Sequence, residues 1–150
     1  MREDEITEIL APCGLDCKRC VAYLDGDISD SSMHLKELLG NFDAYAERYS
    51  RFFPVFSNYP AFKEMLQKFI DADCPGCRNG HPLYPNCGVA TCPSIESKDI
   101  DFCFQCDQFP CDKPQFHPSL DERWRKKNKR MAEVGTIDFY AESLKETRYP

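Results

Sequence analysis

The chain has 150 residues, about the length of one domain, and ten of them are cysteines. Only 42% of the residues are hydrophobic, a share that includes those cysteines, so something besides apolar burial is expected to support the fold. The net charge of −6 resides in residues 1–73, and an acidic chain is a poor general binder of nucleic acid.

The N-terminal residues indicate the cellular compartment. The segment 1–10 carries five charges and no apolar run of the kind found in a signal peptide. No stretch approaches the ~18 apolar residues of a membrane span, so we expect a cytoplasmic protein with no membrane partner. In that reducing compartment, spaced cysteines more often bind metal or act in catalysis than form disulfides.

Apolar spacing and capping residues predict four helical parts. They cover residues 3–10, 31–50, 59–73 and 119–148. We expect Gly40 to bend or split the second part. In the fourth part, Ser119 and Glu122 form a capping box, and Gly135 is expected to end one helix before Thr136 caps the next.

A segment of about 45 residues, 74–118, separates the last two helical parts and contains seven cysteines and seven prolines. It shows no sustained periodicity, and a stretch of that length needs something to order it. The sequence therefore predicts a mainly α-helical single domain, 1–150, with a long irregular cysteine-rich lobe that is stapled by metal.

The ten cysteines fall into four spaced groups, and we predict all of them as candidate metal ligands. The groups are Cys13, Cys17 and Cys20; Cys74 and Cys77; Cys87 and Cys92; and Cys103, Cys106 and Cys111. Two cysteines separated by two residues can present both sulfurs to one ion around a tight turn. The pairs Cys74–Cys77 and Cys103–Cys106 can therefore complete one four-cysteine site of zinc-ribbon type.

The N-terminal group can supply three ligands of a second site, with Cys111, Cys92 or Cys87 as the fourth. Two such sites use eight sulfur ligands. The remaining two cysteines are then buried thiols, or they lie near a metal without binding it. His81 and His117 belong to the same lobe, and either can replace a cysteine at a metal.

The chain contains four cysteine motifs and a C-terminal tail motif in a specific order. They are CGLDCKRCVAY at 13–23, CPGCR at 74–78, CxxxxCP at 87–93, FCFQCDQFPC at 102–111 and the tail RW…VGTIDFYAE. Together they resemble a cysteine-rich family of small bacterial and archaeal proteins, a domain of unknown function. The resemblance implies zinc binding and implies that all four cysteine groups are family features, but it implies no activity.

Sulfur-rich sites suit both zinc and iron–sulfur clusters. We expect two zinc ions, and the alternative is an iron–sulfur (4Fe–4S) redox or sensing protein. The spacing Cys13-x3-Cys17-x2-Cys20 also occurs in radical S-adenosylmethionine enzymes, but this chain has neither their alternating strands and helices nor their length. Cys103 and Cys106 would need a strand–helix–strand unit to act as a thioredoxin-type redox pair, and none is visible.

Closed four-cysteine zinc sites leave no position open for water, so they stabilise and do not catalyse. This favours a small metal-binding protein that acts as a binding or interaction module over an enzyme.

One basic patch interrupts the acidic balance of the chain. It comprises Arg123, Arg125, Lys126, Lys127, Lys129 and Arg130. On a helix these residues spread around most of the circumference, so the simpler interpretation is a solvated face. The functional alternative is a patch for an anionic partner such as RNA or an acidic protein surface. We therefore expect an unknown protein or a small anionic partner, with nucleic acid disfavoured.

Overall fold

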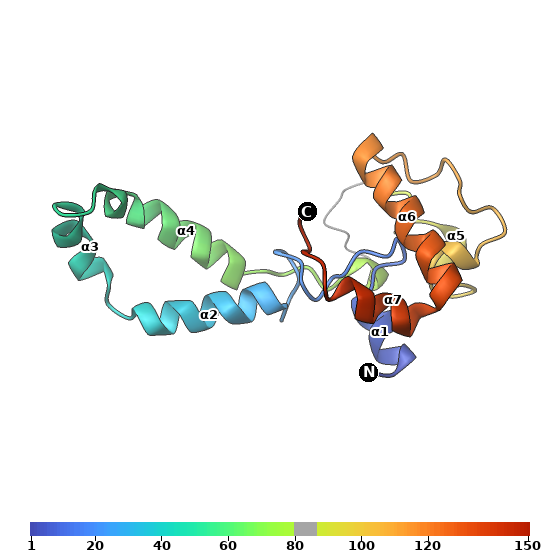
Figure 1. Ribbon diagram of the computed structural model, residues 1–150, viewed down its shortest axis with the longest axis horizontal. Coiled ribbons are helices and arrows are strands. Elements are labelled where there is room, and N and C mark those ends of the chain that lie inside the picture. The colour runs from blue at the N-terminus through green and yellow to red at the C-terminus, as the bar shows by residue number, and fades with distance from the viewer. Residues whose placement is uncertain (80–86) are drawn as a thin grey trace. The chain divides into compact units, whose positions relative to one another are not determined.

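The computed structural model describes residues 1–79 and 87–150, and these form seven α-helices, several short 3-10 helices and no β-strand (Figure 1). The predicted mainly α-helical class is confirmed. The chain divides into two compact units. Unit 1 comprises Met1–Arg19 and Cys74–Pro150, and unit 2 comprises Cys20–Asp73.

Unit 1 is built from three principal helices and three short ones. The principal helices are α1 (Glu3–Ile9), α6 (Pro118–Val134) and α7 (Thr136–Ser143). The short ones are η2 (Cys77–Asn79), α5 (Pro93–Glu96) and η3 (Cys103–Gln105). Helix α6 packs against α7 and η3, and α1 packs against α7. The irregular lobe expected at 74–118 therefore consists, where described, of loops and these short helices.

The ends of α6 and α7 differ from the predicted caps. His117 and not Ser119 caps α6, because the His117 ring accepts a hydrogen bond from the Ser119 N–H and Pro118 occupies the first turn. Gly135 ends α6 and also precedes α7, at a φ of +81° that glycine tolerates best. Thr136 is thus the first residue of α7 rather than its cap.

Six buried side chains form the core of unit 1. They are Ile6, Leu10, Phe102, Met131, Phe139 and Tyr140. Phe104 packs against this core from the same cysteine-rich loop that contributes Phe102. The apolar residues beside the cysteines therefore anchor that loop on the helices.

Unit 2 contains three α-helices and one 3-10 helix. They are α2 (Asp27–Leu39), α3 (Asp43–Ser50), η1 (Pro54–Asn58) and α4 (Tyr59–Ile70). Gly40 splits the second predicted helical part as expected, with a φ of +51° between α2 and α3. Helix α2 packs against α4, and α3 packs against η1.

Unit 2 leaves many large apolar side chains in solvent. Leu38, Phe52 and Val55 are each about 70% exposed, and Met65 of α4 is 59% exposed. Leu66 is the buried residue of α4. Many apolar residues at helical spacing therefore stay exposed, as is typical of a unit this small, which buries only a limited share of its surface.

None of the helices in the two described ranges is long and apolar enough to cross a membrane.

Candidate metal centres

Four cysteines of unit 1 interact electrostatically with one another, and we call them the first sulfur cluster: Cys13, Cys17, Cys77 and Cys87. The thiol of Cys77 is hydrogen bonded to Cys17 and interacts electrostatically with Cys13 and Cys87. The cluster joins three segments: the loop after α1, the start of η2 and the segment that begins at Cys87. The backbone N–H of Cys17 donates to the carbonyl of Ile9 at 2.8 Å, which folds that loop back onto the end of α1.

The thiols of the first cluster shift one another's pKa values in both directions. Burial, together with the neighbouring sulfurs, raises the pKa of Cys13 to about 12. The Cys77 thiol donates to Cys17 and lowers the pKa of Cys17 to about 7, while the pKa of Cys77 itself is raised. The hydrogen bond thus favours the thiolate of Cys17 over that of Cys77, and a cation among the sulfurs would favour ionisation of the other thiols.

Arg78, directly after Cys77, fixes the position of the first cluster. Its guanidinium donates to the carbonyl of Thr7 at 2.8 Å and to the carbonyl of Asp101 at 2.7 Å. It also lies over the Phe102 ring, 4.9 Å from the centroid. This one side chain therefore ties η2 to α1 and to the segment that leads into η3.

Gly88 allows the backbone after Cys87 to approach a second loop closely. A methyl group at Gly88 would lie 2.0 Å from the carbonyl oxygen of Lys113. Only glycine permits this approach.

Four further cysteines line a cavity of about 30 Å³ and form what we call the second sulfur cluster: Cys92, Cys103, Cys106 and Cys111. Burial and the other three sulfurs raise the pKa of Cys103 to about 11. A volume of this size holds an ion or a water molecule and no organic ligand. Arg125, a residue of α6, interacts electrostatically with Cys111. A positive charge therefore also lies near this cluster.

The indole of Trp124 covers the second cluster. Its N–H is fully buried and, within the described residues, is the one buried side-chain nitrogen or oxygen without a well-formed hydrogen bond. It nevertheless lies close enough to Cys103 to lower the pKa of that thiol. Phe109 and Phe116 pack edge-on against the indole at 5.1 Å and 6.0 Å, which holds the N–H in place. A buried donor aimed at a thiol is suited to a thiolate acceptor.

Asn128 of α6 joins the two clusters and was not identified from the sequence. Its amide nitrogen donates to the carbonyl of Cys13 at 3.0 Å, and its amide oxygen accepts from the N–H of Phe104 at 3.0 Å. The residue is completely buried. The signal was available, because a polar residue at the spacing of Trp124 and Met131 stands where the apolar face of α6 predicts a hydrophobic one.

The chemistry of both donor sets fits a thiophilic cation. Each set consists of four thiols, which is the ligand count of a closed tetrahedral site. The sulfurs are neighbours rather than a finished coordination sphere: in the described residues, no three His, Cys, Asp or Glu side chains already stand in metal-ligating positions. Burial is the main cause of the raised pKa values of Cys13 and Cys103, and a bound divalent ion would favour their thiolate forms.

The structure groups the predicted ligands differently from their spacing. Cys77 is hydrogen bonded to Cys17, whereas Cys103 and Cys106 line the small cavity with Cys92 and Cys111. Cys103 also interacts electrostatically with Cys13. This arrangement favours separate sites for the two CxxC pairs over the one shared site that their spacing predicts. None of the ten cysteines is part of a disulfide. Cys20 begins unit 2 and Cys74 resumes unit 1, and both stay predicted ligands.

The two histidines of the lobe have different outcomes. The Nδ1 atom of His117 accepts from the Ser119 N–H at the start of α6, so that nitrogen is engaged as a helix cap. His81 lies outside the described residues.

A family described as "Protein of unknown function (DUF3795)" matches residues 9–116, which is more than two thirds of the chain. The match includes all ten cysteines and unit 2, and it ends before α6. No curated protein and no solved structure matches the chain.

Proposed function

The chain belongs to the DUF3795 family of proteins of unknown function, and we propose that it is a metal-stabilised binding module with two four-cysteine sites, most simply zinc sites. One site uses the first sulfur cluster and the other uses the second. With every ligand position taken by a thiolate, both sites serve structure rather than catalysis.

The observation that carries this proposal is the second sulfur cluster. Cys92, Cys103, Cys106 and Cys111 surround a cavity of ionic size, and the buried N–H of Trp124 lies beside Cys103 without an adequate acceptor. A thiolate at Cys103 supplies that acceptor. The arrangement thus matches the outer-shell hydrogen bonding that is typical of metal-bound sulfur.

A bound zinc ion would cross-link loops that are distant from one another in the sequence. Deprotonated, four cysteines and one divalent ion carry a net charge of about −2 per site. Arg78 and Arg148 near the first cluster and Arg125 near the second lie where they offset part of that charge.

Unit 2 supports the binding role. Its exposed apolar residues include Leu38, Phe52, Phe53, Val55 and Met65. Exposed apolar side chains in this number are typical of surfaces that contact other proteins. We therefore propose an as yet unidentified protein as the partner of unit 2, in a cytoplasmic setting.

An iron–sulfur cluster is the second candidate, because both donor sets consist of sulfur alone. Anaerobic purification followed by elemental analysis and an absorption spectrum separates the two candidates. Colourless protein with about two zinc ions per chain supports the structural sites. Brown protein that contains iron and absorbs near about 400 nm supports the redox or sensing alternative.

A further inference from the structure

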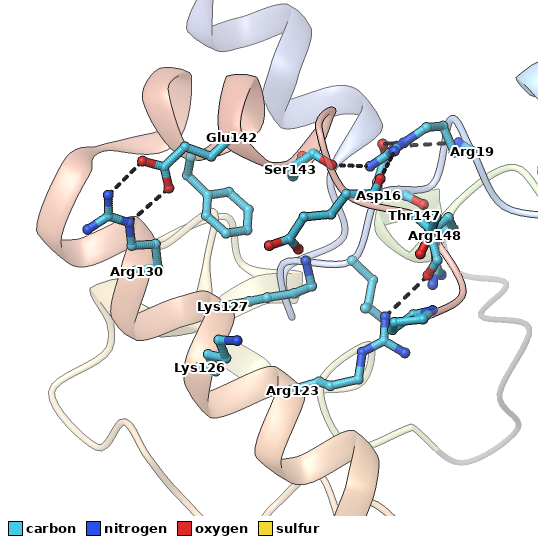
Figure 2. Close-up of a pocket in the computed structure, with 14 residues that line it drawn as sticks. Asp16, Arg19, Arg123, Lys126, Lys127, Arg130, Glu142, Ser143, Thr147 and Arg148 are labelled. Atoms are coloured by element: carbon cyan, nitrogen blue, oxygen red, sulfur yellow. Dashed lines mark hydrogen bonds and ion pairs between the residues drawn. The ribbon is translucent and has the colours of Figure 1, made fainter.

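A pocket of about 450 Å³ lies in unit 1 on the side of α6 that bears part of the basic patch (Figure 2). Its walls are α6, α7, the loop at 15–19 and the segment after α7. The volume lies in the range of sites that hold small organic molecules. Leu15, Phe139 and Pro150 add apolar surface to the walls.

Basic side chains dominate the pocket although the whole chain is acidic. The six that line it are Arg19, Arg123, Lys126, Lys127, Arg130 and Arg148. Three acidic residues also line it, and two of them are engaged: Asp16 by Arg19, and Glu142 by Arg130. The third, Glu146, does not balance the remaining cations. The pocket therefore has a positive excess in a chain whose formal charge is −6.

Hydrogen bonds to the backbone hold three of the guanidinium groups in place. Arg19 donates to the carbonyls of Glu146 and Ser143 at 2.8 Å and 2.9 Å. Arg148 donates to the carbonyl of Asp16 at 2.9 Å, and Arg123 donates to the carbonyl of Arg148 at 3.3 Å. The positive charge is thus positioned in advance, which lowers the entropic cost of binding an anion.

Lys127 is the central cation of the pocket. Its ammonium lies 5.3 Å from the centroid of the Phe139 ring and, in the described residues, takes part in no hydrogen bond or ion pair. Burial lowers its pKa, and the nearby Arg123, Arg148 and Arg19 lower it further, against an opposing effect of Glu146. A half-buried ammonium among guanidinium groups is an unfavourable arrangement that an anion would relieve.

We propose that this pocket binds a small organic anion whose phosphate or carboxylate oxygens contact Lys127, with Arg123 and Lys126 beside it. Phosphate and carboxylate groups share the chemistry that lysine and arginine recognise. A pocket with walls on four segments fits a small molecule better than an extended nucleic-acid strand, which would track a groove. The pocket thus divides the basic patch that the sequence predicts. Four of its residues line the pocket, namely Arg123, Lys126, Lys127 and Arg130, and Arg125 and Lys129 lie outside it.

The test is isothermal titration calorimetry of the full metal-loaded chain with two probes, inorganic pyrophosphate and citrate, at equal ionic strength. We expect saturable binding of at least one probe to one site per chain. The Lys127→Met variant should weaken it about tenfold or more, as expected for loss of a charged hydrogen-bond donor. Lys126→Met should weaken it less, because Lys126 is exposed. Preference for pyrophosphate indicates a phosphate ester as the natural ligand, and preference for citrate indicates a carboxylate.

Lys129→Met is the matched control, because it removes the same charge from an exposed position of α6 outside the pocket. It should change the affinity less than about twofold. Melting temperatures show whether each variant is folded, and Lys127→Met should not lower the melting temperature, since it relieves repulsion. The proposal is overturned if neither probe binds at about 10 mM, or if Lys129→Met weakens binding as much as Lys127→Met. Binding of a single-stranded RNA that neither probe displaces also overturns it.

Discussion

Trp124 and Asn128 connect the cysteine-rich loops to α6 through polar atoms. Trp124 presents an N–H to Cys103, and Asn128 bonds to the backbone at Cys13 and at Phe104. Both side chains are almost completely buried. Buried polar groups in such positions stabilise a fold only when every hydrogen bond is made. Substituting either residue should therefore have a measurable effect on stability or on metal binding.

Substituting Asn128→Leu should lower the free energy of unfolding by about 2–4 kcal/mol, because two backbone groups lose their partners in the core. Chemical denaturation monitored by circular dichroism measures the change. Asn41→Leu, at an exposed position, is the control and should change stability little. Equal stabilities of the Asn128 and Asn41 variants would contradict the role of Asn128.

Trp124→Phe keeps most of the ring and removes the N–H. It should weaken metal binding at the second cluster about tenfold and leave the first cluster unchanged, as is typical for loss of an outer-shell hydrogen bond. Competition with a chromophoric chelator measures the two affinities separately. Two affinities that both equal those of the unsubstituted protein would contradict the predicted bond to Cys103.

Helix α6 is the element that organises unit 1. One face carries Trp124, Asn128 and Met131 toward the cysteine loops and the core, and another carries Arg123 and Lys127 into the basic pocket. The first set repeats at steps of four and three residues and the second at a step of four, as residues on one face of an α-helix do. The cysteine-rich loops are positioned by this helix and by close backbone approaches such as the one at Gly88.

Gly88→Ala should destabilise the protein strongly, because the added methyl group would collide with the Lys113 carbonyl. Gly135→Ala is the matched control: its methyl group meets nothing within 4 Å, and only its φ of +81° is unfavourable. We expect a cost of about 1–2 kcal/mol at Gly135 and clearly more at Gly88. Thermal unfolding of both variants checks the order, and the reverse order would refute the close approach.

The helix breaks at two glycines were predictable, whereas the start of α2 at Asp27, four residues before the predicted one, the end of α7 at Ser143 and the cysteine grouping were not. The break at Gly40 and the stop at Gly135 follow from local backbone preferences that act within a few residues. Spacing identifies which cysteines share a turn, such as Cys103 and Cys106. It carries no information on which turns meet, because packing of Phe102 and Arg78 against α1 decides that.

At the scale of the whole molecule, the two units differ in what stabilises them. All eight cysteines of the sulfur clusters belong to unit 1, while unit 2 is held by helix packing and by a group of aromatic rings around Phe42. The sequence suggested a thin core for the chain. The structure shows where the core is thinnest: unit 1 buries six large residues together, and unit 2 leaves about half of its apolar side chains exposed.

Chelation should therefore affect the two units unequally. Hydrogen exchange measured by mass spectrometry should accelerate in residues 87–111, the loops that carry five cluster cysteines, when metal is withdrawn. Exchange in α2 and α4 should change much less. Equal acceleration in both units would show that the metal sites do not act on unit 1 in particular.

The grouping of the cysteines is tested most directly by zinc content after paired substitutions, measured by elemental analysis. The unsubstituted protein should hold about two zinc ions, and Cys92→Ser with Cys111→Ser, both in the second cluster, should leave about one. Cys77→Ser with Cys106→Ser takes one ligand from each cluster and should leave almost none. If that second pair keeps about one zinc ion, Cys77 and Cys106 share a site and the two clusters are wrongly assigned.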